Sequence, residues 1–130
     1  MRYDEFLARV RELGEYTGQD EAATVTSKVL RVLAQRITPE EAADLAAQLP
    51  EPLREPLIDD GQRQAERFGV EEFCHRIAES IGGHPRTAEW DASAVLTTLA
   101  DAVSGGKLNQ LMSQLPAGYA VLFGKAEISD

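Results

Sequence analysis

The sequence predicts an all-α fold, a compact helical bundle of two pseudo-symmetric three-helix repeats plus short extra helices. Apolar residues recur every three or four positions along most of the chain, which is typical of amphipathic helices. No stretch alternates between apolar and polar residues for long enough to predict a strand. The first half of the chain also matches the second half at many positions. We therefore expect a single domain over residues 1–130.

The internal repeat is clearest where each copy begins. Phe6 and Arg9 recur as Phe73 and Arg76 at an offset of 67 residues. Matches continue at an offset of 66 residues up to two Gln-Leu-Pro sequences. Their leucine is expected to anchor a helix end in the core, and their proline to stop the helix. The two repeats are predicted over about 3–57 and 70–123. The linker between them, 58–69, is polar and is predicted to be partly helical.

Three helices are predicted in the first repeat. Phe6, Val10 and Leu13 recur on one face of a first helix. A longer helix follows over roughly 20–36. The third helix begins after Thr38, because the order Thr-Pro-Glu-Glu supplies an N-cap, a proline at N1 and a glutamate at N3. One or two further helical turns are expected after it.

The second repeat follows the same plan. Phe73 lies on the apolar face of its first helix, Pro85 opens the second, and Ser104 can cap the third. The Gly-Gly-Lys sequence at 105–107 starts this third helix weakly and carries the unfavourable charge for the helix dipole. This helix is therefore expected to be frayed or held by a partner. A short final helix is predicted at 119–123.

The paired patterns resemble a known family. Two copies of Asp/Glu-Glu-Phe-x-x-Arg-Val/Ile occur at 4–10 and 71–77, and each is followed by Val-Leu-x-x-Leu and a Gln-Leu-Pro helix end. These features are similar to a bacterial family known as "domain of unknown function 2267", over residues 3–123. The resemblance implies an all-helical, duplicated domain of the bacterial cytosol. It brings no established reaction and no established site residues.

Composition excludes several classes of protein. The chain is acidic, with 22 acidic and 13 basic residues, a net charge of −9 and no basic stripe, so nucleic acid and anionic membranes are not expected partners. The longest apolar run, Tyr119–Phe123, is too short to span a membrane, and no secretory signal is recognisable. One cysteine excludes a disulfide framework and a four-cysteine zinc site. We expect a cytoplasmic protein.

Repeated charges form the first candidate site. Each repeat contains Glu-x-x-x-Arg-x-x-Glu, which places three charges on one side of a helix. A pocket between the repeats, lined by both sets, would suit a small molecule or a metal ion. The alternative, which the pattern favours, is a set of ion pairs that support the helices. The residues concerned are Glu5, Arg9, Glu12, Glu72, Arg76 and Glu79.

Other reactive residues do not form a catalytic motif. Cys74 and His75 are adjacent on a helix, so their side chains diverge, and Cys74 is expected to be a small core residue. A Cys–His nucleophile would require His75 or His84 to fold onto Cys74. Neither His-Glu-x-x-His nor Cys-x-x-Cys occurs. We therefore assign no catalytic, cofactor-binding or metal-binding residue, and expect no cofactor.

The sequence favours a non-enzymatic protein–protein interaction or adaptor module, which binds another protein or forms a homo-oligomer. Its interface is expected on apolar surface near the weak helix start and the final helix. Reversing the charge of Lys107 and truncating Phe123 to alanine should then weaken association and leave the helical fold largely intact. The alternative is a small-molecule or metal-responsive sensor with a pocket between the repeats. Trp90, the single tryptophan, is compatible with core or interface. The expected interface residues are Lys107, Tyr119, Leu122 and Phe123.

Overall fold

The structure, a computed structural model, describes residues 1–58 and 63–124. Within these two ranges every regular element is a helix, so the predicted all-α class is confirmed. The α-helices are α1 (Tyr3–Gly14), α2 (Gln19–Arg36), α3 (Pro39–Ala47), α4 (Glu51–Arg54), α5 (Val70–Ile81), α6 (Pro85–Ala102) and α7 (Gly105–Met112). The 3-10 helices η1 (Glu55–Leu57) and η2 (Ala117–Phe123) follow α4 and α7.

Side chains cap several of the helix starts. The Thr38 hydroxyl accepts a hydrogen bond from the backbone N–H of Glu41 at 3.1 Å, and the Ser104 hydroxyl accepts one from Lys107 at 3.1 Å. These caps begin α3 and α7 where the sequence predicts them. At the start of α6, Nδ1 of His84 accepts from a backbone N–H in the first turn. Each cap satisfies an N–H group that a helix start leaves without a partner.

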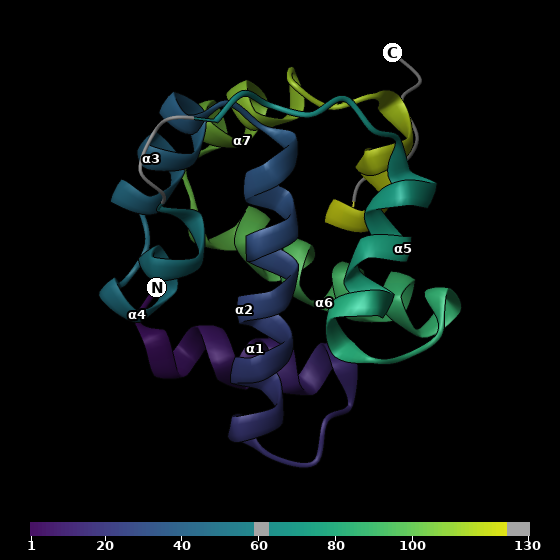
Figure 1. Cartoon of the computed structure of the whole chain (residues 1–130). Coiled ribbons are helices and arrows are strands. Elements are labelled where there is room, and N and C mark those ends of the chain that lie inside the picture. Colours follow the sequence, from purple (N-terminus) through teal and green to yellow (C-terminus); the bar gives the residue numbers. More distant parts are fainter. Residues whose placement is uncertain (59–62, 125–130) are drawn as a thin grey trace.

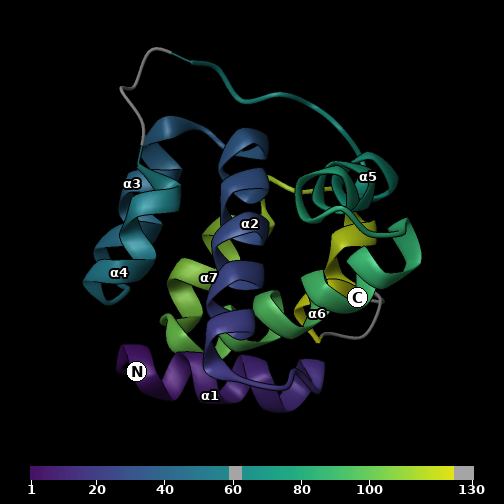
Figure 2. The same ribbon diagram turned by 60° about the horizontal axis from the view of Figure 1, so that its bottom comes forward.

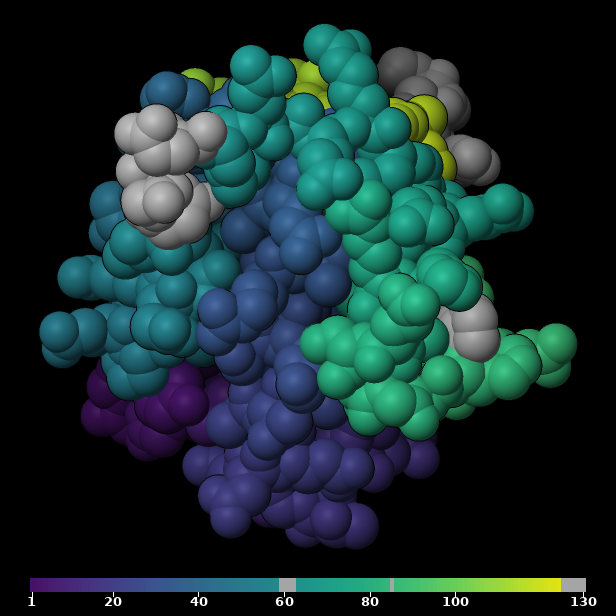
Figure 3. All heavy atoms as spheres, in the orientation of Figure 1, coloured from purple at the N-terminus to yellow at the C-terminus, as the bar shows by residue number. Residues whose placement is uncertain are grey.

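The two long helices, α2 and α6, contact each other and lie at the centre of the packing (Figures 1 and 2). Helix α1 packs against both of them, α5 also packs against both, and α3 contacts α7. On one face of the molecule α2 reaches the surface between neighbouring elements (Figure 3). One core is therefore built from both halves of the chain. Its largest fully buried side chains are Phe6, Leu30, Leu33, Ile37, Leu45, Leu49, Leu57, Phe73, Ile77, Leu96, Tyr119 and Phe123.

Of the linker that the sequence predicts to be partly helical, residues 63–69 form no helix, and residues 59–62 lie outside the described part of the chain. We call residues 63–69 the strap. It runs over one end of α2 towards α5 (Figure 1). The backbone N–H of Glu66 donates to the carbonyl of Gln35 at 2.9 Å, and the guanidinium of Arg63 donates to the carbonyl of Ile37 at 2.9 Å. The strap thus satisfies carbonyls at the end of α2 that a helix leaves unpaired.

Two arginines fix the strap through Phe68. The guanidinium of Arg76 lies 4.0 Å from the centre of the Phe68 ring, and that of Arg36 lies 5.9 Å from it. Arg36 donates to the Phe68 carbonyl at 2.7 Å, and the Tyr119 hydroxyl donates to the same carbonyl at 2.9 Å. Arg76 also pairs with Glu66 at 2.9 Å. Side chains from both halves of the chain therefore hold the strap in place.

Arg76→Ala is expected to lower the free energy of unfolding by about 1–2 kcal/mol, because it removes the stack on Phe68 and the hydrogen bonds to Glu66 and Gln35. Arg76→Lys should recover only part of this loss, since an ammonium cannot reproduce the planar fork of a guanidinium. Urea denaturation measures the change, and limited proteolysis reports release of the strap. Equal stability of the Arg76→Ala variant and the wild type would refute this role.

The Gly-Gly-Lys start of α7 is held from within the chain. Helix α7 begins at Gly105, directly after its Ser104 cap. The backbone N–H of Ser104 donates to Oε1 of Gln48 at 2.9 Å. The ammonium of Lys107 lies 3.3 Å from the carboxylate of Glu41 on α3. The weak helix start therefore finds support in α3, and α7 is a formed helix from Gly105 rather than the frayed one that the sequence offered as one alternative.

Candidate functional site

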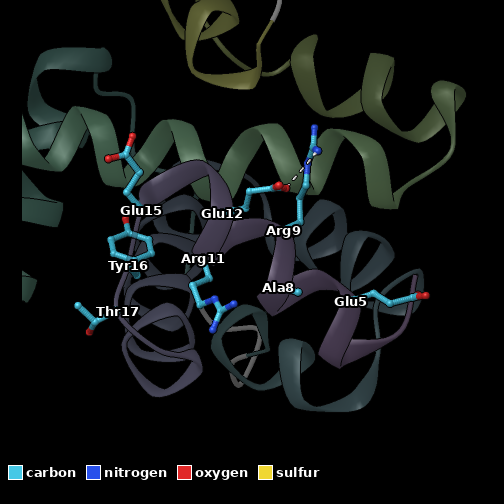
Figure 4. A pocket seen from close by; sticks show the side chains of 8 residues that line it. All are labelled: Glu5, Ala8, Arg9, Arg11, Glu12, Glu15, Tyr16 and Thr17. Atoms are coloured by element: carbon cyan, nitrogen blue, oxygen red, sulfur yellow. Dashed lines mark ion pairs between the residues drawn. The ribbon is translucent and has the colours of Figure 1, made fainter.

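Three of the six expected pocket residues lie together on α1. Glu5, Arg9 and Glu12 line an open hollow of about 820 Å³ on the exposed face of this helix. Figure 4 shows most of the side chains around it pointing in different directions, while Arg9 and Glu12 form an ion pair at 3.9 Å. Arg9 also pairs with Asp101 on α6 at 3.7 Å. The charges do not converge on one point. The other lining residues are Ala8, Arg11, Glu15, Tyr16 and Thr17.

The other three residues, Glu72, Arg76 and Glu79, lie on α5, and none of them lines the hollow on α1. Arg76 pairs with Glu72 at 2.9 Å and holds the strap. Packing explains the separation: α1 and α5 each turn an apolar face towards α2 and α6, and they lie on different sides of the bundle (Figure 1). The structure therefore does not bring the six charged residues together as one pocket.

The four expected interface residues lie inside the protein. Tyr119, Leu122 and Phe123 are at most 2% exposed, and Lys107 is 7% exposed. Val121 is a large apolar residue of η2 that faces solvent, with 53% of its surface exposed. A side chain has to be accessible to bind a partner. The structure consequently places these four residues in the core and not at an exposed interface.

Trp90 on α6 is half exposed, and its orientation is fixed. It exposes 51% of its surface, and its indole N–H donates to the carbonyl of Gly14 at 3.0 Å. The ring borders a small cavity of about 110 Å³ between α1 and α6. An oriented aromatic ring beside a small cavity with a mixed apolar and hydroxyl lining is a suitable anchor point for a partner. We call the residues that line this cavity the Trp90 groove: Leu13, Trp90, Ser93, Ala94 and Thr97.

A second contact of α6 fixes the loop after α1. The Tyr16 hydroxyl donates to Oδ1 of Asp91 at 2.5 Å. Burial raises the pKa of Asp91; the hydrogen bond from Tyr16 opposes this rise and nearby Glu21 adds to it. Burial, and then the bond to Asp91, also raises the pKa of Tyr16, so its hydroxyl stays a donor. Gly14 makes this geometry possible, because a Cβ there would overlap the Tyr16 ring.

Asp91→Asn is expected to gain stability relative to the wild type as the pH rises from about 4 to 7. A raised pKa means that the folded wild type binds this proton more tightly than the unfolded chain, so wild-type stability falls as the pH rises through the folded pKa. Asparagine does not ionise, and its Oδ1 can still accept from Tyr16. Urea denaturation at several pH values measures the difference between the two proteins.

Tyr16→Phe is the companion variant for this test. It removes the hydrogen bond that opposes the rise in the pKa of Asp91, so its stability should fall more steeply with pH than that of the wild type. If the free energy of unfolding of Asp91→Asn falls relative to that of the wild type as the pH rises, the assignment is contradicted.

A larger cavity, of about 460 Å³, lies between α5 and the first turns of α6. Cys74 and His84 both line this cavity. The other lining residues are Val70, Glu71, Arg86 and Glu89. Burial, with a smaller contribution from Glu89, raises the pKa of Cys74 to about 11, so the thiol is protonated at neutral pH. Nδ1 of His84 is already bonded to a backbone N–H. Cys74 therefore lacks the thiolate that a cysteine nucleophile needs.

Among the residues that the structure describes, no group of three or more His, Cys, Asp and Glu side chains is arranged to hold a metal ion. In the same part of the chain, no helix is both long and apolar enough to cross a bilayer. We take the Trp90 groove as the candidate functional site and the α5–α6 cavity as the second candidate.

Sequence reasoning missed the groove because its contacts are distant along the chain. Gly14 and Trp90 are 76 residues apart, and Tyr16 and Asp91 are 75 residues apart. The adjacent Trp90 and Asp91 are the one local signal, an aromatic and an acid together near the start of a long helix. That signal does not identify their partners on the loop after α1.

The fold and these surfaces define a small all-helical protein in which many polar contacts connect one helix to another. A family described as "Uncharacterized conserved protein (DUF2267)" matches residues 3–122, and the chain belongs to this family. The resemblance drawn from the sequence is thereby confirmed. No curated protein matches the chain.

Proposed function

We propose that this chain is a non-enzymatic protein–protein interaction module of the bacterial cytosol, and that the Trp90 groove is its docking site. The observation that carries this proposal is an exposed tryptophan whose orientation is already fixed by the Gly14 carbonyl. A side chain ordered before binding loses little entropy when a partner covers it, and tryptophan is enriched among the residues that dominate binding energy. The single N–H donor of the indole is already bonded, so the group of the partner that covers the ring needs to supply only apolar contact.

The proposed partner is a short protein segment that presents one aliphatic side chain beside basic residues. The cavity next to Leu13 and Ala94, about 110 Å³, is smaller than the ~150 Å³ cavity that holds benzene, which fits one aliphatic side chain. Two exposed glutamates, Glu15 and Glu89, directly follow Gly14 and directly precede Trp90 in the sequence. The whole chain carries a net charge of −9. Basic residues on the partner would therefore be attracted to this surface.

Selection from a phage-displayed peptide library on the folded protein tests the proposal. Enriched peptides should share an aliphatic residue with basic neighbours. They should shift the fluorescence of Trp90, the single tryptophan of the chain, to shorter wavelength. Trp90→Ala should raise the Kd of these peptides about 30-fold or more in calorimetry, as expected when a dominant interface residue is truncated.

Val121→Ala is the matched control, since Val121 is similarly exposed but does not line the groove. It should leave the Kd unchanged. Circular dichroism checks that both variants keep their helical content. Peptides that bind the wild type and Trp90→Ala equally well, or a selection without enriched sequences, would overturn the proposal.

A second candidate function is a small-molecule sensor, which the α5–α6 cavity favours. Its volume of about 460 Å³ is in the usual range for ligand pockets, roughly 300–1,000 Å³. It combines apolar Val70 and Cys74 with charges of both signs on Glu71, Glu89 and Arg86, which suits a small zwitterion. A panel of amino acids and related zwitterions should contain a compound that raises the Tm of the wild type and not of Arg86→Ala. No shift across such a panel would count against this function.

We also propose that the chain is a duplicated unit. Helices α1 and α5 have 12 residues each, α2 and α6 have 18 each, and α3 and α7 have 9 and 8. The starts of each pair are 66 or 67 residues apart. This agreement in length and spacing supports the repeat expected from the sequence.

A further inference from the structure

The starts of α3 and α7 make reciprocal contacts. The backbone N–H of Thr38 donates to Oε1 of Gln114 at 3.2 Å, and that of Ser104 donates to Oε1 of Gln48 at 2.9 Å. Thr38 and Ser104 are 66 residues apart, as are Gln48 and Gln114. Each half of the chain thus supplies a glutamine to the helix cap of the other half.

The same two helices are joined by the ion pair of Glu41 and Lys107, which have the same spacing of 66 residues. Each is the third residue of its helix, with its backbone N–H bonded to the cap. The two side chains are buried, 3% and 7% exposed, and lie 3.3 Å apart. Lys107 also donates to Gln110 at 2.9 Å and lies 3.7 Å from Asp44. Equivalent positions in the two halves therefore face each other with opposite charges.

Because equivalent positions of the two halves carry opposite charges, a first half pairs more favourably with a second half than with another first half. Two first halves in this arrangement would bury two Glu41 carboxylates together, and two second halves would bury two Lys107 ammoniums. Buried charge without compensation is costly, and buried polar pairs are known to specify partners. We propose that Glu41 and Lys107 make residues 3–57 and residues 70–123 complementary interaction partners. The first half of one copy can then bind the second half of a second copy.

The packing between the halves is suited to such an exchange. Helix α1 packs on α6, α5 on α2, and α2 on α6, so the same surfaces would be buried if the halves came from two chains. The linker, 58–69, can span about 40 Å when extended. Within one chain it keeps the halves at an effective concentration of order millimolar. At protein concentrations below this value, the two halves of the wild type therefore pair within one chain.

Two charge reversals test the proposal. Glu41→Lys places two lysines at the pair and Lys107→Glu places two glutamates there, so each variant alone should melt roughly 10 °C or more below the wild type. The two variants are then mixed in urea and refolded together by dialysis. Both charge pairs become complementary only in a dimer that exchanges halves. With one variant labelled with ¹⁵N, native mass spectrometry should show a 1:1 heterodimer at a concentration where the wild type is monomeric, and the Tm should rise.

Two controls accompany the mixture. The double variant Glu41→Lys/Lys107→Glu restores a complementary pair within one chain and should fold as a monomer. Arg31→Glu and Glu55→Arg reverse an exposed ion pair of 3.1 Å inside the first half. A mixture of these two variants should stay monomeric, because no pairing between halves depends on them.

The outcomes separate clearly. A single variant that is unfolded alone and gains helix only in the mixture supports the proposal. If the double variant folds while the mixture stays monomeric or unfolded, exchange of halves is overturned. If the single variants melt like the wild type, or the double variant does not recover, charge complementarity does not select the pairing and the proposal fails.

Discussion

Lys107→Met is expected to lower the free energy of unfolding by about 3–5 kcal/mol. The Glu41 carboxylate is 3% exposed, and the ammonium of Lys107 is its partner in the described structure. Methionine keeps much of the volume of the lysine, so the loss is mainly that of a buried carboxylate left without its cation. Urea denaturation at neutral pH, followed by circular dichroism, measures the change.

The double variant Glu41→Gln/Lys107→Met should recover most of this loss, because it leaves no buried charge. Glu41→Gln alone should cost less than Lys107→Met, since Lys107 retains Gln110 and Asp44 as partners. A double variant as unstable as Lys107→Met would show that the loss does not come from the unpaired carboxylate.

Phe123→Ala is expected to destabilise the protein by about 3–5 kcal/mol, through lost burial and the cavity it leaves. Phe123 is 2% exposed on η2, which packs against α6. This outcome differs from the expectation drawn from the sequence, in which truncating Phe123 leaves the helical fold largely intact. Thermal denaturation followed by circular dichroism measures the effect.

Val121→Ala is a close control for Phe123→Ala. Val121 lies two residues earlier on the same 3-10 helix and is 53% exposed. Its truncation should change the free energy of unfolding by no more than about 0.5 kcal/mol, as is usual for surface positions. Similar losses for the two variants would mean that η2 does not pack as described.

Local signals made the helices predictable. Thr38 and Ser104 occupy the N-cap positions that their side chains predict, and the helical spacing correctly places Phe6 and Phe73 in the core. The burial of η2 was harder to predict. In a 3-10 helix residues three apart lie on the same side, but a short apolar segment does not reveal whether that side covers its own core or a partner.

The candidate sites depend on packing and were less predictable. The sequence shows that Arg9 and Arg76 lie on charged helix faces, but the separation of these faces follows from how α1 and α5 pack on the central helices. The role of Lys107 was similarly hidden. Its charge looks unfavourable for α7 alone and becomes favourable only when Glu41 on α3 is adjacent. Pairings of this kind have no local signature in the sequence.

The strap bears on the timescale of any separation of the two halves. Phe68 is held by Arg36 from the first half and by Arg76 and Tyr119 from the second, so these contacts have to break before the halves part. Contacts that have to break before the transition state for separation of the halves raise the barrier to separation and make separation slow. A chain that has folded alone would then be kinetically trapped in its own pairing. The form it adopts would depend on how many copies are present while it folds, and later changes in concentration would act slowly.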